Sequence, residues 1–96
     1  MLIVRETFMA KPGHASKLAK LFTEFPGGMG KNMRIMTDLT GVYNKVVIES
    51  EYATLAEFEK DWMDYMKDHA AEMEKFREQY QPMYTQGKRE IFRVVA

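Results

Sequence analysis

The order in which strand-like and helix-like segments follow one another constrains the fold of this chain most strongly. Apolar residues alternate with a period of two, as in a β-strand, in four segments, and recur by threes and fours, as in an amphipathic helix, in two. The strand-like segments are residues 2–9, 31–39, 42–50 and 89–95, and the helical segments are residues 15–25 and 55–80. This βαββαβ order uses nearly all 96 residues, so the sequence predicts a single domain over residues 1–96.

Turn and capping residues mark the ends of both helical segments. Pro12-Gly13 stops the first strand, and Pro26-Gly27-Gly28 is predicted to end the first helix. Thr54 and Glu57 have the spacing of a capping box at the start of the second helix, and Pro82 ends it. The second helix is therefore predicted to be one long helix.

Two strand–helix–strand halves give an α+β fold of the ferredoxin-like kind, an antiparallel four-stranded sheet with two helices on one face. The face predicted to lie toward the helices is apolar except for Glu6, Asn44 and Glu90, and holds Leu2, Val4, Phe8, Met33, Ile35, Leu39, Val42, Val46, Ile48, Phe92 and Val94. The other face is mixed, and holds Ile3, Arg5, Thr7, Arg34, Tyr43, Lys45, Val47, Glu49, Ile91, Arg93 and Val95. Charges buried there must pair, and Arg5 or Arg93 with Glu49 is the expected pair.

The third strand is apolar on both faces at Val46-Val47-Ile48. A strand of this kind is covered on both sides, and the helices of the chain cover only one. We therefore expect a homodimer through the second sheet face, the face that carries Ile3, Tyr43, Val47, Ile91 and Val95.

Composition excludes several classes of function. The formal net charge is zero, which argues against a nucleic-acid partner, and the absence of cysteine removes thiolate chemistry. Charge occurs too early at Arg5 and Glu6 for a signal peptide, and no apolar run approaches the roughly 20 residues of a membrane span, so a cytoplasmic protein is expected. The two histidines, His14 and His69, lie on different elements, so no metal site is expected.

The segment Val4–Phe22, the hairpin at Gly41, and the second helix with Trp62 and His69 together resemble the dimeric α+β barrel superfamily. This superfamily includes antibiotic-biosynthesis-type monooxygenases, haem-degrading monooxygenases, NIPSNAP-like proteins and stress-responsive barrel domains. The resemblance implies that two sheets pack face to face into a barrel. It also implies cofactor-independent oxygenation, in which a base deprotonates a phenol-like substrate that then reacts with oxygen. The haem-degrading branch has an Asn where this chain has Glu6, and a wider spacing than that of Trp62 and His69, so haem degradation is not expected.

The candidate site lies in the cleft between the second helix and the sheet. His69 stands on the apolar stripe of that helix and is the candidate base, whereas Glu6 and Asn44 are candidate catalytic or orienting groups. The residues expected to contact a ligand are apolar or aromatic and comprise Phe22, Trp62, Tyr65 and Met66. His69 and Glu6 also have structural interpretations. His69 could be a histidine packed at the helix–sheet boundary and hydrogen-bonded locally, and Glu6 could be solvated at the open end of the cleft.

The sequence leaves two functions open and does not decide whether the protein is an enzyme. The first is a small-molecule-binding barrel protein, a cofactor-independent monooxygenase acting on an aromatic or polycyclic compound. The second is a non-catalytic dimeric module that binds a ligand or a partner chain. An open helix–sheet cleft would favour the first.

Overall fold

The computed structural model describes residues 1–24 and 30–96 and contains the predicted order of strands and helices, except that two helices occupy the segment predicted as one. The elements are β1 (Leu2–Ala10), α1 (Ala15–Thr23), β2 (Lys31–Thr37), β3 (Lys45–Tyr52), α2 (Leu55–Asp68), α3 (Ala70–Tyr80) and β4 (Tyr84–Arg93), with a 3₁₀ turn at Gln81–Met83. The predicted end of the first helix at Pro26-Gly27-Gly28, and Phe25 in its stripe, lie outside the described residues. No helix in the described part of the chain is long and apolar enough to cross a membrane.

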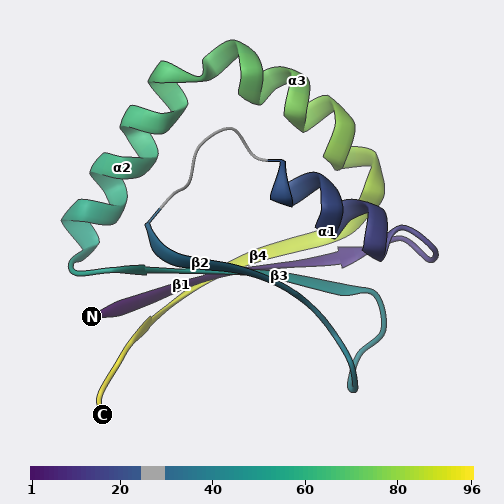
Figure 1. The fold of residues 1–96 in the computed structure, drawn as a ribbon, viewed down its shortest axis with the longest axis horizontal. Coiled ribbons are helices and arrows are strands. Elements are labelled where there is room, and N and C mark those ends of the chain that lie inside the picture. The colour runs from purple at the N-terminus through teal and green to yellow at the C-terminus, as the bar shows by residue number, and fades with distance from the viewer. Residues whose placement is uncertain (25–29) are drawn as a thin grey trace.

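The four strands form one antiparallel sheet in the order β2-β3-β1-β4. Strand β1 is central and pairs with β3 on one side and β4 on the other. Figure 1 shows α1, α2 and α3 on the same side of this sheet. The ferredoxin-like arrangement predicted from the sequence is therefore confirmed.

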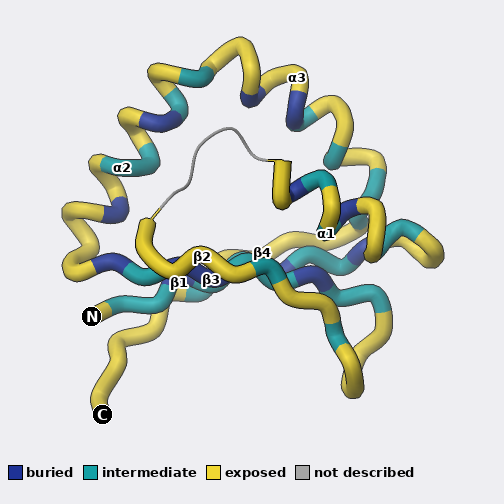
Figure 2. The backbone as a smooth tube through the Cα atoms, in the orientation of Figure 1, coloured by how far each residue is buried: buried dark blue, intermediate teal, exposed yellow. Residues whose placement is uncertain are grey.

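The core lies between the helices and the sheet and is mostly aliphatic and aromatic. Leu18 and Phe22 of α1 pack with Val46 of β3 and Phe76 of α3 in the larger buried cluster. Val4, Tyr52 and Phe58 form a second cluster at the other end of the sheet. In Figure 2 the buried residues of the helices lie on the sides that face the sheet, as an apolar stripe at helical spacing requires.

The second helical segment is two helices rather than one, because the chain bends at His69. His69 has φ −122° and ψ 27°, and it ends α2 and precedes α3. The bend carries α2 and α3 over the sheet as an arch (Figure 1). The start is as predicted, since the Thr54 hydroxyl accepts a hydrogen bond from the Glu57 amide at 3.2 Å. His69-Ala70-Ala71 contains no Pro or Gly, so the break has no breaker residue that a sequence pattern could reveal.

The face assignment of β4 predicted from the sequence is wrong by one residue. Ile91 pairs with Val4, and both therefore face the helices, whereas Phe92 pairs with Ile3 on the opposite face. A shift of one residue moves every side chain of a strand to the other side of the sheet. The error arose because Ile91 and Phe92 are both apolar, so alternation alone could not place them.

The loop between β2 and β3 is longer than predicted and contains two residues that were expected to face the helices. Leu39 and Val42 are exposed in this loop, because β2 ends at Thr37 and β3 begins only at Lys45. Asn44 has φ +67° and closes the loop. The strand alternation that assigned Leu39 and Val42 to the core therefore does not apply there.

The face of the sheet opposite the helices carries a buried carboxylate between two arginines. Glu49 is 7% exposed and accepts hydrogen bonds from Arg5 Nε at 2.7 Å and Arg34 Nη2 at 2.9 Å. Burial alone would raise the pKa of Glu49, but its bonds to both arginines and their charges outweigh burial and lower it. The predicted pair of Arg5 with Glu49 is confirmed, with Arg34 as a third member.

Candidate functional site

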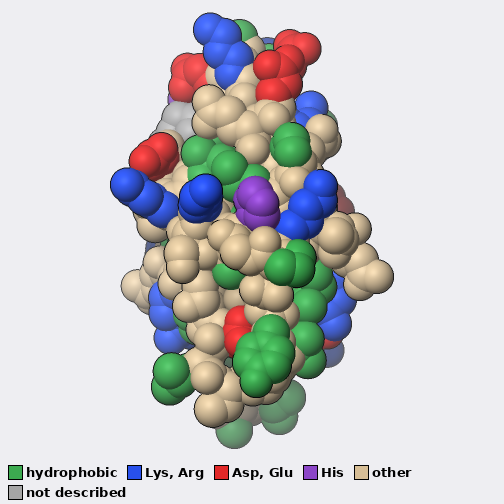
Figure 3. All heavy atoms as spheres, turned by 90° about the vertical axis from the view of Figure 1, so that its right-hand side faces the viewer, with side chains coloured by type: hydrophobic (Ala, Val, Ile, Leu, Met, Phe, Trp, Pro, Cys, Tyr) green, Lys and Arg blue, Asp and Glu red, His purple; other side chains and the backbone are tan. Residues whose placement is uncertain are grey.

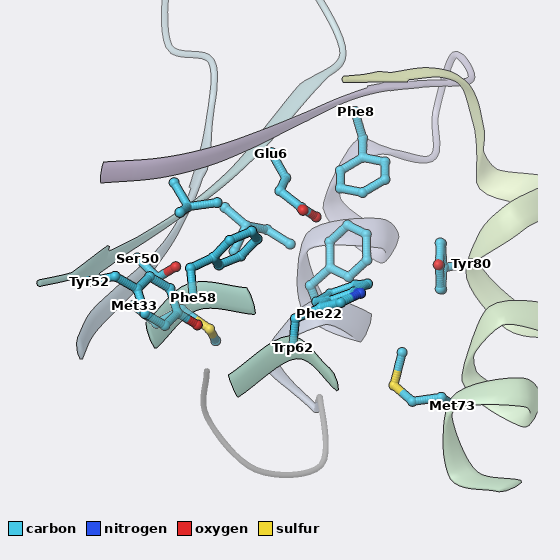
Figure 4. A pocket seen from close by; sticks show the side chains of 12 residues that line it. Glu6, Phe8, Phe22, Met33, Ser50, Tyr52, Phe58, Trp62, Met73 and Tyr80 are labelled. Carbon is cyan, nitrogen blue, oxygen red and sulfur yellow. The ribbon is translucent and has the colours of Figure 1, made fainter. Parts of the chain in front are cut away.

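A pocket lies between the sheet and the arch of helices, at the place predicted for a ligand. It encloses about 90 Å³. The sheet supplies its floor, formed by Val4, Glu6, Phe8, Met33, Ile48, Ser50 and Tyr52. The helices supply its roof, formed by Phe22, Phe58, Trp62, Met73 and Tyr80 (Figure 4). Aromatic rings and methionines predominate, so the pocket suits an apolar, flat molecule.

Glu6 is the only carboxylate among the described residues that line this pocket. It stands in the middle of β1, and its side chain points from the strand into the pocket (Figure 4). Arg89, its pairing partner on β4, donates from Nε to Glu6 Oε1. The pair is partly exposed, with 25% of the Glu6 side chain and 37% of the Arg89 side chain accessible.

Arg89 joins Glu6 to helix α2 through two aromatic rings. Its guanidinium carbon lies 4.6 Å from the centre of the Trp62 ring and 5.3 Å from that of Phe58. Guanidinium over an aromatic face is an attractive cation–π arrangement. Glu6, Arg89 and Trp62 therefore form a chain of contacts from the central strand, through the edge strand, to the roof of the pocket.

A second contact between the sheet and α2 is made by Tyr52, which bonds to Asp61. The Tyr52 hydroxyl donates to Asp61 Oδ2 at 2.8 Å, and the Gly30 amide donates to the same oxygen at 3.1 Å. Burial, followed by Asp61, raises the pKa of Tyr52 well above its usual value. Tyr52 therefore remains a protonated donor that ties β3 to α2, and we assign it a structural role.

The structure brings together some of the residues predicted for the site and leaves others outside. Glu6, Phe22 and Trp62 line the pocket. The described lining does not include the other predicted residues, which are Asn44, Tyr65, Met66 and His69.

Asn44 lies in the loop immediately before the start of β3, where its backbone carbonyl accepts from the Ala10 amide at 2.7 Å. Glu6 pairs with Ile48 instead, so the fold does not bring Asn44 to Glu6, although their strands are neighbours.

His69 is at the bend between α2 and α3 rather than over the pocket. Its side chain is one-third exposed, and Nδ1 lies 3.5 Å from Glu72 Oε1. The ring centre is 4.7 Å from that of Tyr65. Burial, followed by the charge of Glu72, raises the pKa of Tyr65 to about 12, so its hydroxyl stays protonated near neutral pH. His69 therefore lies at the junction of α2 and α3, and its buried Nδ1 has no hydrogen-bond partner in the described structure.

Sequence reasoning missed Arg89 and Phe58 as members of the site. Arg89 was not placed because the face of β4 was assigned one residue out of register, and correct pairing with Glu6 would have revealed it. Phe58 was visible on the apolar stripe of the helix, but nothing distinguished it from core residues. Among the described residues, no group of three or more His, Cys, Asp or Glu side chains could hold a metal ion.

Solved structures share this fold over nearly the whole chain. A NIPSNAP-like domain protein from Burkholderia xenovorans has a TM-score of 0.83 and 14% identity, covering 99% of this chain and 85% of its own. A NIPSNAP family protein from Agrobacterium tumefaciens has a TM-score of 0.80 and 14% identity, covering 95% and 82%. A structure described as an antibiotic biosynthesis monooxygenase has a TM-score of 0.69 and 14% identity, covering 100% of both chains.

No protein-family model and no curated protein sequence matches the chain. At 14% identity the likeness to these structures establishes the fold. The fold is that of NIPSNAP-domain and antibiotic-biosynthesis-monooxygenase-like proteins, as the resemblance of the sequence implied. The function of this chain depends on the chemistry of its own pocket, because one fold hosts many functions.

Proposed function

We propose that the protein binds a small aromatic or polycyclic molecule in the pocket around Glu6, and that it acts as a homodimer. The observation that carries the proposal is Glu6, the only carboxylate among the described lining residues, which points into a pocket lined mostly by aromatic and aliphatic side chains. Few polar groups in a concave apolar wall are the usual composition of a small-molecule site, in which the polar group sets orientation.

The side chains that line the pocket indicate which kind of ligand it can bind. Rings of Phe22, Phe58 and Trp62 offer flat apolar surfaces to an aromatic molecule. Arg89 occupies Oε1 of Glu6, so Oε2 is the atom to which a ligand hydroxyl would donate. About 90 Å³ is less than the roughly 150 Å³ of a cavity that holds benzene, so a larger ligand requires lining side chains to move. Met33, which is flexible and exposed, is the side chain best suited to do so.

The reaction that this site would support is monooxygenation without a cofactor, and one of the structures with this fold is described as an antibiotic biosynthesis monooxygenase. Glu6 would accept the proton of a phenol, and the deprotonated ring would react with O₂. With 1-naphthol one oxygen atom enters the ring as a carbonyl, giving 1,4-naphthoquinone, and the other leaves as water with the two hydrogens lost by the substrate. His69 and Asn44 take no part in this proposal, since neither is among the described lining residues.

The homodimer is proposed through the sheet face opposite the helices. That face has no helix over it in the described structure (Figure 1), and it holds the half-buried Ile3 and Val47. Phe92 and Met36 are exposed on the same face. On this face the buried carboxylate of Glu49 is already paired with the more exposed Arg5 and Arg34, as a covered interface requires. Because of the corrected register, Phe92 replaces Ile91 in the predicted contact surface.

A non-catalytic ligand-binding module is the second candidate, and a specific observation favours it. Arg89 already neutralises the carboxylate that would have to act as the base. In that case Glu6 and Arg89 would orient the ligand, and no oxygen would be consumed.

Titration with 1-naphthol separates these possibilities. Trp62 is the single tryptophan of the chain, so its indole N–H gives one resolved NMR signal at the pocket. We expect saturable movement of this signal, with affinity falling about tenfold or more in Glu6→Gln and unchanged in Glu57→Gln, an exposed carboxylate on α2. Naphthalene, which lacks the hydroxyl, should bind the wild type as weakly as 1-naphthol binds Glu6→Gln.

No movement of the Trp62 signal at about 1 mM ligand, a concentration that reveals even weak binding, would refute the proposed site. If 1-naphthol binds, an oxygen electrode and the absorbance of 1,4-naphthoquinone decide between the two candidates. Oxygen uptake that is lost in Glu6→Gln supports the monooxygenase. Binding without uptake supports the non-catalytic module.

A further inference from the structure

Ser50 is a second polar side chain in the wall of the pocket, and the proposed binding of a phenol at Glu6 does not use it. It is 9% exposed and lines the pocket from β3. On the outer surface, Figure 3 shows side chains of both charges on the face that it draws, so the described part of that face has no single sign of charge to attract an ionic ligand. Selectivity beyond the Glu6 contact is therefore expected inside the pocket, where a buried polar group discriminates strongly between ligands.

Glu6 and Ser50 lie on neighbouring strands and on the same side of the sheet. Glu6 of β1 pairs with Ile48 of β3, and Ser50 is two residues further along β3. Residues two apart on a strand share a face, so both side chains are on the pocket side of the sheet (Figure 4). Diagonal neighbours of this kind lie about 7–8 Å apart. Two polar groups on one bicyclic aromatic molecule can span that separation.

Asp61 fixes the direction of the hydrogen bonds behind Ser50. The Tyr52 hydroxyl and the Gly30 amide both donate to Asp61 Oδ2, at 2.8 Å and 3.1 Å. An ionised carboxylate only accepts hydrogen bonds, so the single proton of the Tyr52 hydroxyl is committed to Asp61. Ser50 also hydrogen-bonds to the Tyr52 side chain. Because the Tyr52 proton is already used, Ser50 is the donor in that bond.

The ionisation of Tyr52 agrees with this direction. Burial and then Asp61 raise the pKa of Tyr52, whereas the bond with Ser50 acts in the opposite direction. A donor to the phenol oxygen stabilises the charged form and has this effect. The three side chains therefore form a relay in which Ser50 donates to Tyr52 and Tyr52 donates to Asp61.

The relay leaves Ser50 without a proton for the pocket, so it presents only oxygen lone pairs to a ligand. Glu6 is in the same position, because Oε1 accepts from Arg89 and Oε2 can only accept. These two residues therefore offer a ligand two acceptors and no donor. A carbonyl or ether oxygen placed at Ser50 would meet another lone pair, and a buried acceptor without a donor costs free energy.

We propose that Ser50 determines the specificity of this pocket by selecting an aromatic diol, whose first hydroxyl donates to Glu6 Oε2 and whose second donates to Ser50 Oγ. The inference rests on the proposed binding of an aromatic molecule at Glu6 and names the second polar group of that molecule. Ser50 orients the ligand and takes no part in proton abstraction. Tyr52 and Asp61 do not contact the second hydroxyl and act by holding the Ser50 proton away from it.

Titration of the Trp62 indole signal under argon, with ligands that differ in one group, tests the inference. 1,5-Dihydroxynaphthalene should bind the wild type about tenfold more tightly than 1-naphthol does, well above the roughly twofold gain that its symmetry alone provides. In Ser50→Ala the gain should fall to that symmetry factor, with the affinity for 1-naphthol unchanged. Ser16→Ala, at an exposed serine on α1, is the matched control and should keep the whole gain.

Tyr52→Phe gives a readout that a purely structural role of Ser50 would not produce. Without the Tyr52 hydroxyl, the Ser50 proton is free to turn into the pocket and to donate to an ether oxygen. 5-Methoxy-1-naphthol has such an acceptor in place of the second hydroxyl. It should bind the wild type more weakly than 1-naphthol does, and Tyr52→Phe more tightly. If Tyr52→Phe does not fold, Ser50→Ala decides the inference alone, because it removes one oxygen and leaves the bond between Tyr52 and Asp61 in place.

Failure of this inference is distinguishable from failure of the proposed site. If 1-naphthol binds and Glu6→Gln weakens it, but the diol gains no more than about twofold or keeps its gain in Ser50→Ala, Ser50 does not select the ligand and the proposed site stands. An unchanged preference in folded Tyr52→Phe overturns the direction of the relay, and with it the selection of a diol. If neither 1-naphthol nor the diol moves the Trp62 signal at about 1 mM, both the inference and the proposed site are refuted.

Discussion

The ion pair of Glu6 and Arg89 should stabilise the protein by a measurable coupling energy, although both side chains are partly exposed. We consider Glu6→Gln, Arg89→Met and the double variant as a double-mutant cycle. Gln keeps the size of Glu6 and removes its charge. Met keeps the aliphatic length of Arg89 and removes both the charge and the guanidinium plane that lies over Trp62.

The magnitude follows from the exposure of the pair. A hydrogen bond to a charged group contributes about 1.5–3 kcal/mol when sheltered, and an exposed ion pair contributes at most about 1 kcal/mol. The Arg89 side chain is 37% accessible, so solvent screens the pair. We therefore expect a coupling energy close to the limit for an exposed ion pair, at about 1 kcal/mol. Arg89→Met also loses the stacking on Trp62, about 0.5–1 kcal/mol, so its total loss should be about 2 kcal/mol against about 1 kcal/mol for Glu6→Gln.

Urea unfolding followed by far-ultraviolet circular dichroism is the appropriate assay, because the fluorescence of Trp62 would change with Arg89 itself. The matched control is the cycle of Lys88→Met and Glu90→Gln, a more exposed pair on the same strand whose charged atoms are 3.4 Å apart. Its coupling should be no more than about 0.3 kcal/mol. If the Glu6–Arg89 coupling is no larger than that of the control, the pair does not connect the strands to the pocket roof as we infer.

Two further predictions concern the sheet face opposite the helices and the hydrophobic core. Because the pKa of Glu49 is lowered in the folded protein, its stabilisation is fully present above the ordinary carboxyl value of about 4.3 and is lost as the pH falls through the folded value. The difference in melting temperature between wild type and Glu49→Gln should therefore shrink from pH 6 to pH 3, and a constant difference would contradict the assignment. Phe22→Ala should cost about 3–5 kcal/mol in urea unfolding, because the buried ring packs on Phe8, Phe76 and Tyr80. Met63→Ala, at an exposed site, should change stability by no more than about 0.5 kcal/mol, and similar losses for the two variants would show that Phe22 is not a core residue.

The parts of the fold that sequence could predict are those fixed by local periodicity. Alternation in residues 2–9 and the stripe from Leu55 onward determine which element forms and which side it buries, and both are found in the structure. The Thr54 cap at the start of α2 was also predictable, because it depends only on the spacing between Thr54 and Glu57. The pair of Arg5 with Glu49 was predictable because both charges were assigned to the same face of the sheet.

The parts that could not be predicted depend on choices between nearly equal alternatives. Ile91 and Phe92 are both apolar, so only pairing with β1 decides which of them faces the helices. That decision also places Arg89 beside Glu6, where it bonds to the carboxylate of the pocket. His69 was expected over the cleft because an unbroken helix would carry the stripe there, but the bend places it between two helices.

The central position of β1 has a consequence for the order in which the sheet forms. Its contact with β3 joins Arg5 to Glu49, 44 residues apart in the chain, whereas its contact with β4 joins Glu6 to Arg89, 83 residues apart. Closing the longer loop costs more chain entropy before any contact is gained, so β4 should pair last in refolding. Until then one edge of β1 is unpaired, and such an edge is a site for association with other unfolded chains. Formation of the Glu6–Arg89 ion pair therefore marks the step that closes this edge of β1.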